Sequence, residues 1–127
     1  MSSGSSQANK FYEEVSESQR LWFAETDDGD VLEFDVDGDV LEFDVDGDKV
    51  SFPLWSSKSR IIRLKKLNPE LLGEYSPRVI SWQFFKDVLS PMLIENNRLI
   101  GVNFSGQNIT GIDLTVESLI KQIEAFA

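Results

Sequence analysis

The chain has 127 residues, the length of a single domain, and 41% of them are apolar, which favours a folded globule. It contains no cysteine and no histidine, so disulfides, thiolate metal sites and the usual general base near neutral pH are excluded. The net charge of −10 argues against a nucleic-acid partner, because phosphate binding requires cations. No apolar run is long enough to span a bilayer and no signal segment opens the chain, so we expect a cytoplasmic protein without a membrane partner.

The dominant feature is a tandem repeat. Residues 28–36 read DGDVLEFDV, and residues 37–45 repeat them letter for letter. Independent drift would have made the copies differ, so the sequence indicates a recent or engineered duplication of a strand-turn segment. We expect this duplication to lie within one domain of residues 8–127, preceded by a disordered tag or tail at residues 1–7.

The first elements follow from apolar spacing. A helix is expected to begin near Gln7 or Ala8, with Phe11 facing the core and Glu14 turned to water. The aromatic segment at residues 21–26, which ends at an Asp-Gly pair, predicts a strand entering a tight turn.

Three Asp-Gly pairs between alternating apolar residues predict hairpin turns, because a type I′ turn needs positive φ at both central positions. A turn at residues 46–47 would place Phe43 opposite Val50. A turn at residues 28–29 would continue the same apolar face to the strand at 21–26. These pairings predict an antiparallel meander.

A further turn at residues 37–38 would add one strand and reverse the direction of every later strand. We therefore expect one copy to fill the central strand position while the other forms a long acidic loop, since doubling a loop costs only about 0.6 kcal/mol. The copies are identical, so either can occupy the position, and the chain would exchange between two strand registers. The segment that exchanges includes Asp28, Phe34, Val36, Asp37, Phe43 and Val45. We expect a monomer, with a strand-swapped dimer as a risk.

Helical and strand patterns alternate in the remainder of the chain. We expect a basic helix at residues 57–67, a turn-rich segment at 70–78 and a helix that starts after Ser81 and is kinked or restarts at Ser90-Pro91. Strands near residues 99–104 and 109–114 and a C-terminal helix capped by Thr115 should follow. The predicted class is α+β, an antiparallel β-meander with helices packed on one face, plus the strand near 99–104 and the C-terminal helix.

Five segments carry a resemblance to a known family: Leu21-Trp22-Phe23-Ala24, the Asp-Gly hairpin, Pro53-Leu54-Trp55, the helix from Trp82 to Leu93, and Ile100-Gly101-Val102-Asn103. They resemble the bacterial family called domain of unknown function 2750. The similarity covers most of the domain once one repeat copy is removed, and a looser similarity links the chain to the enhanced serine sensitivity protein B family. The resemblance implies a fold, and the family brings no established activity.

The acidic runs at residues 35–39 and 44–48 are similar to the start of a calcium-binding loop, but the required glycine and glutamate are missing. Counted from the first run, those positions hold Val40 and Asp46. No activated nucleophile and no phosphate-binding loop are present either. We therefore expect no catalytic residues, no metal and no cofactor, and a protein that is not an enzyme.

Two classes of function remain. In the first, the chain is a partner-binding domain: the indoles of Trp22 and Trp55 fall on the sheet face opposite Phe23 and Leu54, where exposed tryptophan beside acidic residues would suit a cationic protein. In the alternative interpretation of these residues, a helix covers both tryptophans.

The second class is a small-molecule or anion site. Arg60 and Arg63 lie near the start of the predicted helix at residues 57–67, where an anion would be stabilised. Such a site would lie between this helix and the sheet.

Overall fold

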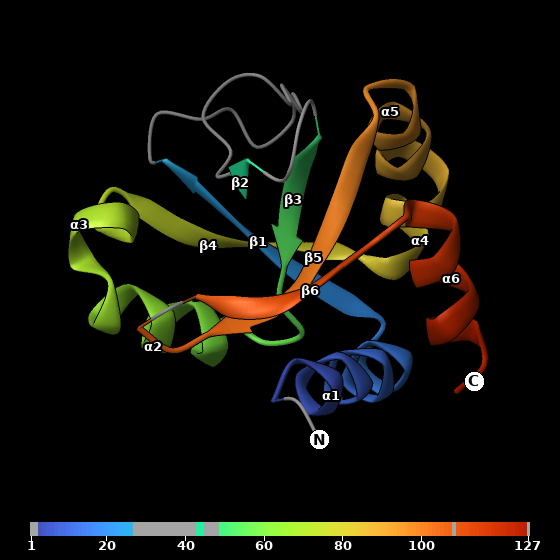
Figure 1. Ribbon diagram of the computed structural model, residues 1–127. Coiled ribbons are helices and arrows are strands. Elements are labelled where there is room, and N and C mark those ends of the chain that lie inside the picture. Colours follow the sequence, from blue (N-terminus) through green and yellow to red (C-terminus); the bar gives the residue numbers. More distant parts are fainter. Residues whose placement is uncertain (1–2, 27–42, 45–48, 108, 127) are drawn as a thin grey trace.

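The computed structural model describes residues 3–26, 43–44, 49–107 and 109–126, and Figure 1 shows helices arranged around two β-sheets. The mixture of helices and strands confirms the predicted α+β class. Within these ranges, the helices are all too short or too polar to cross a membrane. The elements, in chain order, are α1 (Ser3–Ser18), β1 (Arg20–Thr26), β2 (Phe43–Asp44), β3 (Val50–Leu54), α2 (Lys58–Leu67), α3 (Pro69–Leu72), β4 (Tyr75–Ser81), α4 (Trp82–Phe84), η1 (Phe85–Leu89), α5 (Ser90–Glu95), β5 (Arg98–Ser105), β6 (Thr110–Leu114) and α6 (Val116–Glu124).

The strands form a four-stranded sheet in the order β2-β3-β5-β6 and a two-stranded sheet of β1 and β4. Strand β3 runs parallel to β5, whereas the other paired strands are antiparallel. One bridge joins the two sheets, where the backbones of Trp22 and Trp55 exchange two hydrogen bonds of 2.8 Å. For the described residues the predicted antiparallel meander is therefore wrong, because β3 pairs in parallel with a strand from the far end of the chain.

The partner of β1 is β4, which overlaps the segment at residues 70–78 that the sequence predicted to be turn-rich. Pro77 and its polar neighbours favoured turns in that prediction. In the structure Pro77 lies opposite Ala24 in an edge strand, where proline is tolerated because the outer N–H groups have no ladder partner.

The β2–β3 pair has a different register from the predicted one. Phe43 lies opposite Ser51 rather than Val50, and a shift of one residue turns a side chain to the other face of the sheet. The Phe43 ring consequently packs against Phe104, with 5.6 Å between the ring centroids. Packing on Phe104 outweighs the two-residue turn that the Asp-Gly pair favours locally. The other residues of the predicted exchange segment lie outside the described ranges.

Two hydrophobic clusters lie on opposite faces of the strands. Phe23 and Leu54 belong to the larger cluster with α1, α6 and the helical segment from α4 to α5, whereas Trp55 belongs to the smaller one with α2 and α3. Helices therefore pack on both faces, which corrects the prediction of helices on one face. Each buried apolar side chain of the two clusters stabilises the fold by about 1.5 to 3 kcal/mol relative to an exposed one. Packing on both faces of the strands therefore contributes to stability.

The helix expected after Ser81 forms, and regular α-helix resumes at Ser90, where the sequence predicted a kink or a restart. Ser81 Oγ accepts a hydrogen bond of 3.0 Å from the Phe84 amide, as an N-cap should. The π-helical turn η1 then bonds the Ser90 amide to the Phe85 carbonyl, so the helix widens just before Pro91, which has no N–H to offer. The wider turn also rotates the side chains that follow it about the helix axis, relative to those that precede it.

Other helix ends agree with the sequence to different degrees. α1 begins at Ser3, so the prediction of a disordered tail at residues 1–7 is wrong for residues 3–7. Extending an existing helix towards its N-terminus adds one hydrogen bond for each residue that becomes ordered. Ser57 precedes α2 in an extended conformation, which confirms that helix. Thr115 Oγ1 accepts from the Ser118 amide at 3.1 Å, which confirms the predicted cap of α6.

Two glycines make room for the ring of Phe104 against the sheet. A Cβ atom added at Gly101 would lie 2.6 Å from the ring and 2.8 Å from Ser51 Oγ, and one added at Gly111 would overlap the ring. The position of Phe104, which sets the β2 register, thus requires glycine on both β5 and β6.

We expect Gly111→Ala to lower the free energy of unfolding by about 1 to 3 kcal/mol, the usual cost of overpacking. Urea denaturation measures this loss. The matched cycle uses Phe104→Ala: with the ring removed, Gly111→Ala should cost clearly less than it does alone. If Gly111→Ala lowers the free energy of unfolding equally with and without the Phe104 ring, the ring is not the reason for glycine at position 111.

Candidate functional site

The candidate site begins at a bulge in β5. The pairing of β5 with β6 shifts register between Val102 and Ser105, and Asn103 adopts a left-handed backbone with φ of 48°. Asparagine tolerates this conformation better than most residues. The bulge takes the Asn103 side chain and the Phe104 carbonyl out of the ladder and makes them available to other elements.

Two consecutive residues of β5 contact two consecutive residues that follow β3. The indole Nε1 of Trp55 donates a hydrogen bond of 2.9 Å to the Phe104 carbonyl. Asn103 Oδ1 accepts from the Ser56 amide at 2.9 Å, and Asn103 Nδ2 donates to Ser56 Oγ at 3.1 Å and to the Gln7 carbonyl at 3.3 Å. Asn103 is buried, so these bonds replace water for nearly all of its polar atoms.

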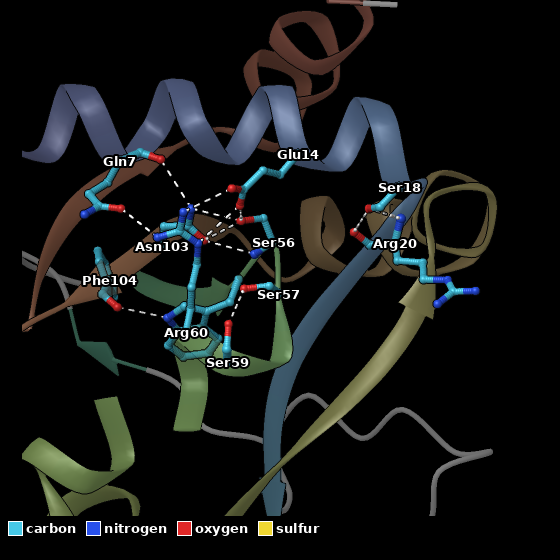
Figure 2. Close-up of polar contacts among 11 residues, drawn as sticks. Gln7, Glu14, Ser18, Arg20, Ser56, Ser57, Ser59, Arg60, Asn103 and Phe104 are labelled. Atoms are coloured by element: carbon cyan, nitrogen blue, oxygen red, sulfur yellow. Dashed lines mark hydrogen bonds and ion pairs between the residues drawn. The ribbon is translucent and has the colours of Figure 1, made fainter. Parts of the chain in front are cut away.

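An ion pair extends this network to α2. Arg60 Nε and Nη2 each lie 3.3 Å from a carboxylate oxygen of Glu14, and Arg60 Nη1 donates to Gln7 Oε1 at 3.0 Å. Ser56 Oγ donates to the same carboxylate. Gln7, Glu14, Ser56, Arg60 and Asn103 are called the Asn103 cluster below, and Figure 2 shows them between α1, α2 and β5.

The surroundings of Glu14 change its pKa in two directions. Burial raises the pKa of this carboxyl, because it disfavours the charged form. The hydrogen bonds from Ser56 and Arg60, together with the positive charges of Arg60 and Lys10, outweigh burial and hold the pKa below its ordinary value of 4.5. Glu14 is therefore a stable carboxylate and a weak proton acceptor.

The chemistry of the Asn103 cluster is that of a structural junction. Ser56 Oγ is buried and bonded to Glu14, so a substrate has no access to it as a nucleophile. The adjoining cavity, lined in part by Arg60 and Arg63, has a volume of about 30 Å³, which suits about one water molecule. In the described part of the chain, no three acidic side chains are grouped so that they could hold a metal ion.

The structure buries the predicted site residues Trp22 and Trp55 to different extents. Trp22 and Trp55 do share the face opposite Phe23 and Leu54, as predicted. However, Trp55 is fully buried under α2 and Trp22 is partly buried, so the interpretation in which a helix covers the tryptophans holds for Trp55. The predicted recognition surface is wrong at this residue, because its indole N–H already bonds within the fold.

The two arginines also differ. Arg60 is paired with Glu14, which compensates its charge and disfavours the anion site predicted at this helix. Arg63 is exposed, and it lines the small cavity together with Arg60. The predicted small-molecule site between helix and sheet therefore has little room.

Sequence reasoning missed most of the Asn103 cluster. Glu14 was placed among the water-facing residues of the first helix, although its partner Arg60 lies on another helix. A signal was present at Asn103, since asparagine is depleted from strands and here interrupts an apolar one. The glycines at 101 and 111 were a second signal, because glycine in a strand marks close backbone approach.

The fold and the cluster define a class: a small α+β domain in which polar side chains fix two helices to a bulged strand. Comparison with known proteins then gives the family. A model described as "Protein of unknown function (DUF2750)" matches residues 8–123, and the chain belongs to this family. A search of the curated proteins and a search of the solved structures each found no match.

We expect Glu14→Gln to remove a pH-dependent part of the stability. The pKa of Glu14 is lower in the folded than in the unfolded chain, so protonation favours unfolding. The contribution is therefore present above pH 4.5, the ordinary value, and is lost as the pH falls below it. Urea denaturation of both proteins from about pH 7 to about pH 3 should show their difference shrinking on acidification.

The matched control is Glu17→Gln, which changes an exposed carboxylate on the same helix. Its effect on the free energy of unfolding should stay near zero at every pH. A difference between Glu14→Gln and the parent protein that stays constant down to about pH 3 would contradict the account of the ion pair.

Proposed function

We propose that this chain is a small acidic cytoplasmic binding domain whose two identical strand copies compete for the β2 position. The observation that supports the proposal is that Phe43 and Asp44 of β2 belong to the second copy of the repeat and have identical counterparts in the first. Phe43 and Asp44 are the seventh and eighth residues of the second copy, and Phe34 and Asp35 are the same residues of the first. Every contact that β2 makes is therefore chemically available to the first copy.

The described contacts of β2 are those with β3 and with Phe104. Phe43 and Asp44 pair with Ser51 and Val50, and the Phe43 ring contacts Phe104. Among the described strands, β2 lies at the edge of its sheet, where local opening costs less free energy than global unfolding. Exchange between copies therefore does not require the rest of the domain to unfold.

The numbers of residues that would connect β2 to its neighbours favour neither register strongly. With the second copy in place, 16 residues (27–42) precede β2 and five (45–49) follow it. With the first copy in place, seven residues (27–33) would precede the strand and 14 (36–49) would follow it. Loop closure cost grows with the logarithm of length, so the two arrangements differ by only about 0.2 kcal/mol, which is less than thermal energy. Both registers should be populated.

The copy of the repeat that does not occupy the β2 position, called the surplus copy below, supports a binding role. Each copy carries four acidic residues in a chain of net charge −10, which favours a protein partner of positive charge. The same copy could also fill the β2 position of a second molecule, giving a strand-swapped dimer. The tethered copy competes at an effective concentration of the order of millimolar, so we expect a monomer below that concentration.

We further propose that the repeat arose by duplication, that no small-molecule or anion site lies between α2 and the sheet and that the chain is not an enzyme. The identity of the two copies supports a recent or engineered duplication. The alternative, an anion site between α2 and the sheet, loses support because Arg60 is paired with Glu14. That the chain is not an enzyme is supported by the buried, hydrogen-bonded state of Ser56.

Alanine substitution of the two equivalent phenylalanines tests the exchange. If either copy can fill the position, Phe34→Ala and Phe43→Ala should each lower the free energy of unfolding by only about 0.4 kcal/mol, the loss of one of two equivalent states. The double variant should lose the whole aromatic contact, about 2 kcal/mol or more. Urea denaturation of the three variants gives this comparison.

The control is the single-copy chain, since deleting residues 28–36 or 37–45 yields the same sequence. In that chain Phe34→Ala should cost as much as the double substitution does in the parent. The proposal fails if Phe43→Ala alone carries the full cost in the parent while Phe34→Ala costs nothing.

A further inference from the structure

The exposed face of α2 carries a group of cations. Five of the twelve Lys and Arg residues of the chain lie at positions 58 to 66, although the net charge is −10. Lys58, Arg63 and Lys66 are exposed, and within the described ranges no acidic side chain lies within ion-pair distance of any of them. Arg63 and Lys66 are three positions apart and therefore neighbours on the helix surface, where like charges repel. Carboxylates of a partner would relieve this repulsion.

The position of Lys58 is unfavourable for the helix itself. Lys58 is the first residue of α2, where the positive end of the helix dipole disfavours a cation, and the first turn contains no acidic residue. Lys65 and Lys66 lie in the last turn, where the dipole favours cations. Helix stability therefore explains the cations of the last turn and does not explain Lys58, whereas an anionic partner explains both.

Apolar side chains alternate with these cations. Ile62 is 37% exposed and Leu67 is 42% exposed, although such side chains are usually buried. Ile62 lies four positions after Lys58 and four before Lys66, and Leu67 lies four positions after Arg63, so each is a surface neighbour of a cation. The exposed face of α2 thus combines positive charge with apolar contact area.

A hollow of about 370 Å³ adjoins the C-terminal end of this face, where α2 meets α3. Figure 1 shows the two helices together at one side of the molecule. The described residues that line the hollow are Leu67, Asn68, Pro69, Glu70 and Leu71. Leu71 is 44% exposed, so the hollow offers apolar surface to an incoming side chain.

Hydrogen bonds fix the turn that forms the hollow. Asn68 Nδ2 donates to the Leu64 carbonyl and to the Gly106 carbonyl, each at 3.1 Å. The Asn68 carbonyl accepts from the Leu72 amide at 2.9 Å. The hollow is therefore formed before a partner arrives, which lowers the cost of binding.

We propose that this face binds an acidic peptide segment of a partner protein, with carboxylates at Lys58, Arg63 and Lys66 and one apolar side chain in the hollow. The surface goes beyond the exchange of strand copies, because its residues lie outside the duplicated segment. It also differs from the site predicted between α2 and the sheet, because these three cations are exposed.

Charge and shape favour a short acidic segment over nucleic acid or an anionic membrane. The net charge of −10 opposes the approach of an extended polyanion. A short segment that contacts only α2 meets mainly the local cations, because salt screens charges beyond about 8 Å. The apolar hollow adds a contact that a phosphate backbone does not use.

Titration of the full chain with three capped peptides, followed by amide NMR shifts, tests the proposal. EDDLFEDDE carries both carboxylates and apolar side chains, QNNLFQNNQ lacks the charge, and EDDSSEDDE lacks the apolar side chains. We expect EDDLFEDDE to bind with a dissociation constant of about 1 mM or lower and to shift amides of α2 and α3. Each of the other two peptides should bind at least about fivefold more weakly.

Variants at exposed positions assign the binding to this face. Lys58→Gln and Arg63→Gln should each weaken binding of EDDLFEDDE about three- to tenfold. Glu70→Gln should strengthen it, because it removes a carboxylate from the lining of the hollow. Lys121→Gln is the matched control, since it removes an exposed cation on α6 and should leave the affinity unchanged.

The proposal is overturned if EDDLFEDDE gives no shifts at about 10 mM or if QNNLFQNNQ binds equally well. It also fails if Lys58→Gln and Arg63→Gln bind like the parent, or if duplex DNA or anionic vesicles shift the same amides at lower concentration. Binding that becomes more than about tenfold tighter in the single-copy chain would assign the face to the surplus copy instead of a partner.

Discussion

At Asn103 the β5 backbone enters the left-handed region, and much of the domain is arranged around this bulge. The Asn103 side chain turns to the Ser56 amide and the Gln7 carbonyl, while the next carbonyl, that of Phe104, accepts the Trp55 indole. A left-handed asparagine costs of the order of 1 kcal/mol, which the buried hydrogen bonds offset because each would otherwise leave an unsatisfied group. One local distortion thereby joins α1, the β3–α2 turn and β5.

The same bulge determines where a duplicated strand can go. It places the Phe104 ring over two glycines, and that ring is the aromatic partner of Phe43 in β2. In the described part of the sheet, this ring contacts one phenylalanine of the repeat, and we propose that the two identical copies compete for that place. Trp55 is fully buried, so its indole is not exposed to a partner, although the sequence predicted Trp55 as a recognition residue.

Features set by neighbouring residues could be predicted from the sequence, and features set by distant contacts could not. The helix caps at Ser81 and Thr115 were predictable because a hydroxyl precedes an apolar-periodic run. The β2 register was not, because the hairpin preference of Asp-Gly yields to packing on Phe104, far along the chain. The pairing of Glu14 with Arg60 was hidden for the same reason, since each residue alone is typical of a solvated helix face.

Hydrogen exchange at the Ser56 amide in Asn103→Gly tests the role of the bulge most directly. Glycine keeps the left-handed backbone and removes the side chain, with its acceptor for the Ser56 amide and its donor to Ser56 Oγ and the Gln7 carbonyl. The account predicts that the chain still folds, that the Ser56 amide loses its protection, and that the free energy of unfolding falls by about 1 to 3 kcal/mol, the cost of a buried amide left unpaired. A Ser56 amide as well protected in Asn103→Gly as in the parent protein would contradict it.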